Sequence, residues 1–490
     1  MNMEDADIRL GRNTTAILSS QLLIKIISFL YMVFLARHLG EKGLGQLTFA
    51  AAFAELFNIF SDFGLSTVTV REVSRNRGLS DQFLKNVLSL RLLISMTVFI
   101  VIVAAANLSG FQREVLMAIY LYGLAQVIIA FGSTYQSILN AFERMYYGSI
   151  ISTASTALIS ITGLILIQFG FGVVWFASLH LVWAIPAGWA YYLCGRREGI
   201  VFQVGVDWKI WKYLITSAVP IGFGVAMYVI YNRVDLIMLK YMKNYYDVGI
   251  YSVAYRMMGY FHFLIWALMG ASAPAFSKHF ARDRAALKEL GERSARYLIF
   301  FGTPVAVGSS LLAESIIRFL YEGRFQEAAT VFALLALTTA IVFFGATFGT
   351  ILLNADLKGS RFYAWTATGG VIFNILLNLF LIPRFSYLGA AAATIATDLI
   401  TSMIAFIYVV KNICRIAVVK PIVKALISCS IMAIPVLFLR EKNIWLPAII
   451  LVGMIAYIAV AVILRFFTPE DGKLLRSVFL SAGPSVGKEE

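Results

Sequence analysis

The sequence predicts an all-α membrane protein with fourteen transmembrane helices, arranged as two similar six-helix lobes followed by a helix pair. An apolar composition, fourteen apolar stretches of spanning length and an internal repeat support this prediction. Of the 490 residues, 60% are apolar and 14% are charged, and the mean hydropathy is +0.80. Soluble domains are about 45–50% apolar and about 25% charged. A water-soluble fold cannot cover this much apolar surface, so the solvent is lipid.

The composition also excludes several classes of function. A net charge of +14 would indicate nucleic-acid binding in a soluble protein. In a membrane protein it follows from basic cytoplasmic loops, so we expect no nucleic-acid partner. The three cysteines are far apart and form neither a disulfide framework nor a metal-binding spacing. The four histidines are scattered and no P-loop occurs, so we expect neither an enzyme nor an ATP-driven pump.

An apolar stretch of about 20 residues crosses a bilayer as a helix. Stretches of this length, bounded by charged residues, glycine or proline, recur along the chain. The first is too long for a signal peptide, and acidic residues precede it. The predicted spans are residues 15–37, 44–65, 88–106, 115–139, 146–169, 172–194, 211–239, 247–276, 296–319, 327–354, 361–382, 387–410, 421–440 and 444–466.

The distribution of lysine and arginine predicts the orientation of these spans. With a cytoplasmic N-terminus, the cytoplasmic segments carry 27 of these residues and the outer loops carry 10. Basic loops stay on the cytoplasmic side, so we expect both termini there. The most basic loop contains residues 277–296, whose mixture of apolar and charged residues is typical of an interfacial helix.

The chain contains an internal repeat. Gly45 and Gly249 each begin a similar six-residue segment at the start of a predicted span. Leu-Asn-Ala at 139–141 and at 353–355 ends the fourth and the tenth spans, and a glycine precedes both the sixth and the twelfth. The spacings are 204, 214 and 217 residues, which indicates two six-helix units of the same orientation.

This repeat defines the predicted domains. Residues 1–200 form the first lobe, 201–415 form the second, and 416–490 contain the last two helices and a cytoplasmic tail. Parallel repeats of this kind are typical of transporters, which bind the substrate between the two lobes.

Charged residues inside the predicted spans indicate a substrate site. Such a charge costs roughly 2.5–3.5 kcal/mol, so it usually lines a cavity or forms a pair. Lys25 and Glu55 are central in the first two spans, and Arg233 and Arg256 lie in the seventh and eighth. The excess of cations suits an anionic substrate, most often a phosphate. We predict that these four residues bind substrate; a structural ion pair between Lys25 and Glu55 is the alternative.

A second polar group lies in the seventh, eleventh and twelfth spans. Asn374 and Asn378 are four residues apart and share a helix face, as do Thr394 and Asp398. With Asp235 they offer only oxygen ligands and amides, which suit a hard cation such as Na⁺, or a proton on Asp235. We predict a cation site at Asp235, Asn374, Asn378 and Thr394. Hydrogen bonds that only pack the helices together are the alternative.

Three other features fall inside the spans. Pro-Ile-Gly-Phe-Gly at 220–224 is expected to bend the seventh span. Arg233 and Asp235 are two residues apart, so they point to different partners. Arg91 and Asp62 lie near cytoplasmic span ends, where we expect their side chains to extend to the interface.

Seven short segments form a set that extends over essentially the whole chain. They are 34–45 (FLARHLGEKGLG), 61–65 (SDFGL), 70–72 (VRE), 233–235 (RVD), 248–256 (VGIYSVAYR), 378–383 (NLFLIP) and 388–394 (LGAAAAT). Together they resemble the prokaryotic polysaccharide flippases of the multidrug/oligosaccharidyl-lipid/polysaccharide (MOP) exporter superfamily. The resemblance implies two six-helix lobes around a V-shaped, cationic central cavity that opens alternately to the two sides of the plasma membrane.

The resemblance also implies a substrate and two sites. Members of this family move polyprenyl-diphosphate-linked oligosaccharides to the outer leaflet. In related peptidoglycan-precursor flippases, basic residues on helices one and eight bind the diphosphate, and Lys25 and Arg256 stand at similar places, although arginine is usual on helix one. Those relatives also bind sodium on helices seven, eleven and twelve. The predicted cation site resembles theirs, with Asn378 where a carboxylate is common.

Three other functions fit parts of the sequence. A peptidoglycan-precursor flippase is a close variant, although that group has several central basic residues in the first span. A cation-coupled multidrug antiporter of the same superfamily usually has twelve spans and an acidic cavity. A membrane glycosyltransferase or repeat-unit polymerase would need a large outer loop, whereas the predicted outer loops are short. We expect a polysaccharide polymerase and glycosyltransferases as partners instead.

Overall fold

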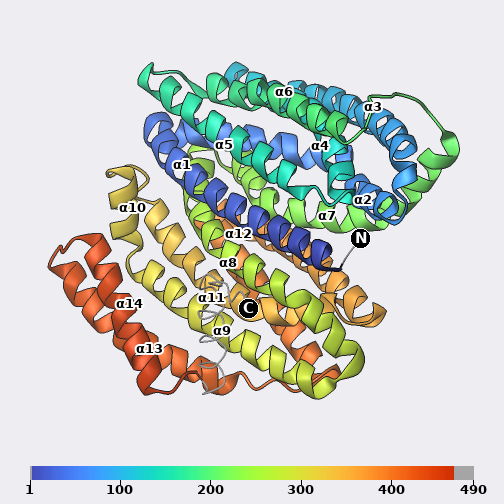
Figure 1. Ribbon diagram of the computed structural model, residues 1–490. Coiled ribbons are helices and arrows are strands. Elements are labelled where there is room, and N and C mark those ends of the chain that lie inside the picture. The colour runs from blue at the N-terminus through green and yellow to red at the C-terminus, as the bar shows by residue number, and fades with distance from the viewer. Residues whose placement is uncertain (1–2, 468–490) are drawn as a thin grey trace, which may run out of the picture. The chain divides into compact units, whose positions relative to one another are not determined.

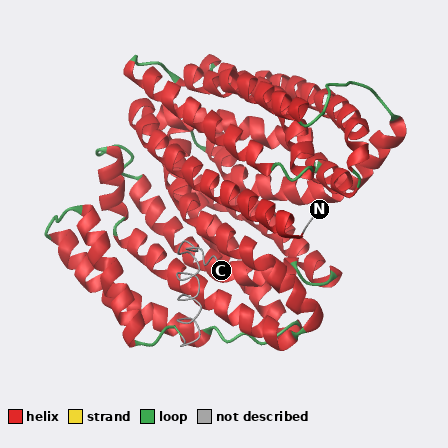
Figure 2. Ribbon diagram, viewed as in Figure 1, coloured by secondary structure: helices red, strands yellow, loops and turns green. Residues whose placement is uncertain are grey.

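The computed structural model describes residues 3–467, with side chains from residue 19 onward except at 263, 264, 266, 267 and 271. Throughout this range the regular elements are helices joined by short loops (Figure 2). In chain order they are α1 (Met3–Asp62), α2 (Leu65–Arg75), the short 3-10 helix η1 (Arg77–Leu79), α3 (Ser80–Leu108), α4 (Arg113–Ala141), α5 (Met145–Gln168), α6 (Val173–Arg197), α7 (Trp208–Met242), α8 (Tyr245–Arg282), α9 (Arg284–Leu311), α10 (Ala313–Tyr321), α11 (Ala328–Leu353), α12 (Leu357–Asn412), α13 (Val419–Glu441) and α14 (Leu446–Ile463).

Two long helices each cover a pair of predicted spans. α1 is interrupted at Gly40, with φ 66°, and α12 at Ser386, with φ 49°, so one helix follows the other without a loop. Within the described residues, ten helices are long and apolar enough to cross a membrane, or eleven if α9 and α10 form one span bent by 71°. The predicted total of fourteen spans stays a prediction.

The chain forms two compact units, each assembled from separate segments. Unit 1 contains Met1–Tyr260, Ile317–Val331 and Ala364–Ile400, and unit 2 contains the rest. In unit 1, α4 packs against α3 and α6, and α1 packs against α5 and α7. In unit 2, α13 lies beside α14 and α9 (Figure 1). Since these units follow packing and not the repeat, the lobes at 1–200 and 201–415 stay a prediction.

The two repeated glycines meet in unit 1. A Cβ atom on Gly45 would lie 1.7 Å from the Tyr245 carbonyl oxygen, and one on Gly249 would lie 1.9 Å from the Glu41 carbonyl oxygen. Each glycine therefore faces the residue four positions before the other. This reciprocal contact is what a two-fold axis between the two repeats would produce.

The predicted interfacial helix over 277–296 is wrong. α8 ends at Arg282 and α9 begins at Arg284. The Asp283 carboxylate accepts hydrogen bonds from the backbone N–H groups of Ala285 at 2.9 Å and Ala286 at 3.0 Å. Aspartate at this N-cap position satisfies two amides that a continuous helix would use internally, so it starts a new helix.

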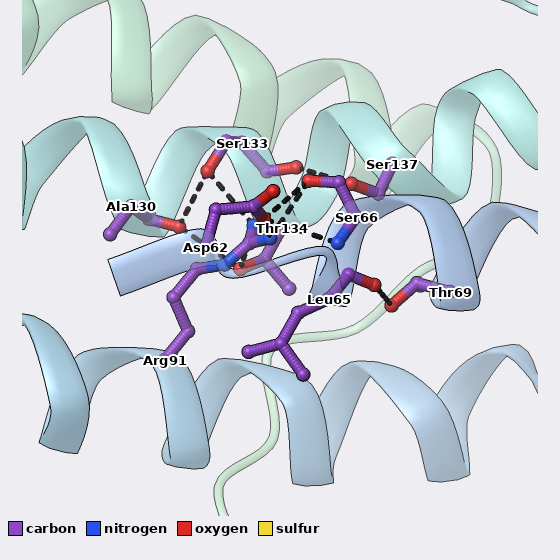
Figure 3. A network of polar contacts seen from close by, with 9 residues as sticks. All are labelled: Asp62, Leu65, Ser66, Thr69, Arg91, Ala130, Ser133, Thr134 and Ser137. Atoms are coloured by element: carbon purple, nitrogen blue, oxygen red, sulfur yellow. Dashed lines mark hydrogen bonds and ion pairs between the residues drawn. The ribbon is translucent and has the colours of Figure 1, made fainter. Parts of the chain in front are cut away.

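Arg91 does not extend to the interface as predicted, because its side chain is only 1% exposed. Figure 3 shows its guanidinium between α2 and α4. It forms an ion pair with Asp62 and donates hydrogen bonds to the hydroxyls of Ser66 at 2.8 Å, Ser133 at 2.9 Å and Thr134 at 3.2 Å. The Asp62 carboxylate also accepts a bond from the Ser66 backbone N–H at 3.1 Å. This buried charge is paired, as burial requires.

Candidate substrate and cation sites

A short stretch of α7 contacts three other helices of unit 1 through consecutive polar side chains. The Tyr231 hydroxyl donates to Asp398 of α12 at 2.5 Å. Asn232 accepts from the Tyr255 hydroxyl of α8 at 3.0 Å, and Arg233 forms an ion pair with Glu55 of α1. Two residues further, Asp235 contacts α8 and α12. As the spacing predicts, Arg233 and Asp235 point to different partners. We call residues 231–235 the α7 hub.

Asp235 is buried, and both of its carboxylate oxygens accept hydrogen bonds. Oδ1 accepts one from the Asn378 amide at 2.7 Å. Oδ2 accepts one from the Tyr251 hydroxyl at 2.6 Å and one from the Thr394 hydroxyl at 3.1 Å. The Asn378 amide also donates to Asn374 Oδ1 at 2.9 Å, so these two residues share one helix face. The structure therefore brings together all four residues of the predicted cation site.

The donor set of this cluster fits a monovalent hard cation. It combines one carboxylate with hydroxyl and amide oxygens, and no group of three His, Cys, Asp or Glu residues that could hold a metal occurs among the described residues. Asn378 Oδ1 and Asn374 Nδ2 are buried without a hydrogen-bond partner there. Such orphaned atoms need an explanation. A cation beside Asp235 would require the Asn378 amide to rotate so that its oxygen, not its nitrogen, faces the carboxylate.

The four residues predicted to bind substrate have different partners in the structure. Glu55 pairs with Arg233, so the alternative pairing of Lys25 with Glu55 is wrong; sequence position cannot show which spans meet. Lys25 is half-buried and has no ion pair in the described part of the chain. Arg256 has its Nη1 atom 3.5 Å from the Met32 sulfur and lies within electrostatic range of Glu55 and Arg233.

Two tyrosines of the site were not predicted from the sequence. Tyr251 binds the Asp235 carboxylate, and its ring stacks on Tyr255 with centroids 5.6 Å apart. Tyr231 binds Asp398. The available signal was the four-residue spacing of Tyr251 and Tyr255, which places two hydroxyls on one face of an apolar span. Tyrosine is common near membrane interfaces, so this spacing alone does not indicate a site.

The fold and the site together define an all-helical, multi-pass membrane protein with charged side chains inside its apolar helices. The chain belongs to the polysaccharide biosynthesis protein family, which matches residues 10–280. The probable flippase AglR of Haloferax volcanii is 29% identical over 214 residues, 42% of this chain and 43% of AglR. The chain thus matches less than half the length of that relative. An uncharacterized membrane protein of Methanocaldococcus jannaschii is 22% identical over 426 residues, 77% of this chain and 79% of that protein.

Solved structures show the same fold. The lipid II flippase MurJ, in an inward closed conformation, has a TM-score of 0.74 and 17% identity, covering 92% of this chain and 98% of MurJ. An inward-facing MATE family multidrug resistance transporter of the MOP superfamily has a TM-score of 0.63 and 13% identity, covering 79% of this chain and 94% of the transporter. The helices of this chain therefore adopt the fold of this superfamily.

Proposed function

We propose that the protein is a flippase, not an enzyme, and that it moves a polyprenyl-diphosphate-linked oligosaccharide from the cytoplasmic to the outer leaflet by alternating access. The observation that carries this proposal is the set of cations within apolar helices. Arg256 has no carboxylate within hydrogen-bond distance among the described residues, and neither has Lys25. A cation in such surroundings needs an anion, and a diphosphate supplies one. The names of AglR and MurJ agree with this class of activity.

The test is transport by the purified protein in proteoliposomes. A fluorescent polyprenyl-diphosphate disaccharide is reduced by external dithionite once it reaches the outer leaflet. Arg256→Ala should abolish this transport, and Arg256→Lys should restore part of it, since lysine cannot form the two-pronged contact. Arg113→Ala, which removes an exposed arginine at the start of α4, serves as the matched control and should transport normally.

Two outcomes would favour the alternatives. Transport of a peptidoglycan precursor in preference to other lipid-linked sugars would indicate a peptidoglycan-precursor flippase. Export of a cationic dye without movement of the diphosphate lipid would indicate a multidrug antiporter. In the proposed role, the protein acts between the glycosyltransferases that build the lipid-linked unit and the polymerase that extends it outside.

We further propose that Na⁺ or H⁺ couples transport through Asp235. Support comes from the convergence of Asn374, Asn378 and Thr394 on this carboxylate. Asp235→Asn should remove the dependence of the transport rate on a sodium or proton gradient, because the amide cannot carry the charge that binds either ion. Asp81→Asn, an exposed change in the first turn of α3, is the control. If the Asp235→Asn variant keeps its full dependence on the ion gradient, the hydrogen bonds of this cluster only pack the helices together.

A further inference from the structure

The ion pair between Glu55 and Arg233 has a different environment from the buried pair formed by Arg91. The Arg233 side chain is 33% exposed and that of Glu55 is 37% exposed. Within the described residues, Arg233 has no other hydrogen bond. Arg91, in contrast, is 1% exposed and binds three hydroxyls besides its carboxylate. The Glu55 pair is therefore open to a competing ligand.

We propose that Glu55 is a displaceable counter-ion: it neutralises Arg233 in the substrate-free state, and an anionic diphosphate group replaces it on the guanidinium when substrate binds. This inference rests on the proposed function and assigns Glu55 a role opposite to that of a substrate ligand.

The surroundings of the pair favour such an exchange. The α7 hub is held on both sides of Arg233, by the bond of Asn232 with Tyr255 and by the bonds of Asp235. The helix therefore keeps Arg233 in place when Glu55 leaves. Arg256 lies within electrostatic range of both members of the pair. Arg256 thus places a second guanidinium near that of Arg233, which adds to the attraction for an anion.

The chemistry of the competitors gives the direction of the exchange. A guanidinium binds phosphate oxygens through two parallel N–H donors, and a diphosphate carries more negative charge than one carboxylate. An ion pair whose side chains are about one-third exposed is weak, so it lowers the affinity for the diphosphate only slightly. After the lobes change conformation, the return of Glu55 to Arg233 competes with the diphosphate and speeds its release. Glu55 thus lowers affinity and raises turnover.

Binding of farnesyl diphosphate to the full-length protein in phosphatidylcholine nanodiscs tests this proposal, with farnesol as the uncharged control. Glu55→Gln should tighten binding about threefold, the factor that corresponds to a half-exposed ion pair. Arg233→Gln should weaken it at least about tenfold, because it removes the charged hydrogen bonds of the guanidinium to phosphate. In the Arg233→Gln background, Glu55→Gln should have a smaller effect, because no pair is left to compete.

A second measurement separates displacement from a general charge effect. In proteoliposomes, Glu55→Gln should lower the transport rate at saturating lipid-linked substrate, although it binds the diphosphate more tightly. Glu114→Gln, an exposed change in the first turn of α4, removes the same charge elsewhere and should alter neither quantity. Glu55→Asp keeps the charge on a shorter side chain and should fall between wild type and Glu55→Gln.

Several results would overturn the inference. Weaker or unchanged binding by Glu55→Gln would show that Glu55 orients Arg233 or binds substrate. If Glu55→Gln raises the affinity equally in the wild-type and Arg233→Gln backgrounds, Glu55 only repels the negatively charged ligand and does not compete for Arg233. If wild type binds farnesyl diphosphate no better than farnesol, the proposed function and this inference both fail. If wild type binds it and Glu55→Gln does not bind it more tightly, only the inference fails.

Discussion

At the scale of single residues, burial separates structural from functional charges. Arg91 is enclosed by Asp62, Ser66 and the hydroxyls of α4, which bind its two Nη atoms, whereas its buried Nε atom has no hydrogen-bond partner among the described residues. Its partner is not enclosed, because the Asp62 side chain is 46% exposed. Removing Asp62 and removing Arg91 should therefore lower the stability of the protein by different amounts.

We expect Asp62→Ala to destabilise the protein more than Arg91→Met. The first change leaves the buried Arg91 charge without its anion, which costs about 3–5 kcal/mol. The second leaves Asp62 able to reach solvent and fills the space of the arginine stem with another long side chain. The double variant should recover part of the stability that Asp62→Ala loses. Thermal unfolding of the purified variants in detergent provides the measurement.

The order of these melting temperatures decides the interpretation. Equal losses for both single variants, without recovery in the double variant, would mean that Asp62 acts mainly by accepting the hydrogen bond of the Ser66 amide in the first turn of α2. Thr97→Ala, which removes an exposed hydroxyl that bonds only within α3, is the control for disturbance of that helix.

The residue pattern predicted only part of the candidate site. It placed Asn374 and Asn378 on one helix face, and their hydrogen bond confirms that placement. The alternative that it offered for Glu55, an ion pair with Lys25, was wrong, and it missed Tyr251. Helical spacing fixes which residues of one helix share a face. Which helices meet depends on packing between segments more than a hundred residues apart, and no local pattern contains that information.

At the scale of helices, glycine allows two repeated segments to touch. The missing side chains of Gly45 and Gly249 let the starts of the second half of α1 and of α8 approach to backbone contact. Close approach of this kind is typical of membrane helices, whose association depends on packing and not on the hydrophobic effect.

Gly45→Ala and Gly249→Ala should each destabilise unit 1 by about 1–3 kcal/mol, the usual cost of overpacking. The new methyl group would meet a backbone carbonyl that cannot rotate away, at 1.7 Å and 1.9 Å respectively. Thermal unfolding in detergent measures the loss. Gly259→Ala on the same α8 has nothing within 4 Å and is the matched control. It should be neutral or stabilising, because alanine favours a helix more than glycine does. If Gly259→Ala lowers the stability by a similar amount, the loss comes from bending of the helices and not from the backbone contacts of Gly45 and Gly249.

Helix limits were predicted well where loops separate the spans. The span predicted at 115–139 corresponds to α4, and that at 146–169 to α5, within a few residues. Within the span predicted at 296–319 the chain turns at Leu312, between α9 and α10, and this turn was not predicted. Apolar residues continue through this turn, so composition gives no sign of it. The backbone leaves the helical conformation at Leu312, with φ −98° and ψ 7°, and at Gly40, with φ 66°.

At the scale of the whole chain, contacts within unit 1 join loops that the charge distribution predicts on one side. Arg37 at the outer end of the first predicted span binds Glu322 of a predicted outer loop at 2.5 Å. Arg144 binds Glu198 at 3.1 Å, and both lie in predicted cytoplasmic loops. Residues on opposite sides of a bilayer cannot touch, since its apolar core alone is about 30 Å thick. These contacts are thus consistent with the predicted order of crossings.

Cysteine labelling in intact cells tests this topology directly. In a variant without Cys194, Cys414 and Cys429, single cysteines should react with a membrane-impermeant maleimide at Arg384 and Asn443, which lie in predicted outer loops. Cysteines at Lys209 and Lys358 should react only after the membrane is permeabilised, because basic loops stay inside. All four positions are exposed, so burial cannot mimic protection by the membrane. The opposite pattern would reverse the orientation and place the predicted diphosphate site nearer the cytoplasmic face. A mixed pattern would show that the number of crossings between positions 209 and 443 differs from the predicted one.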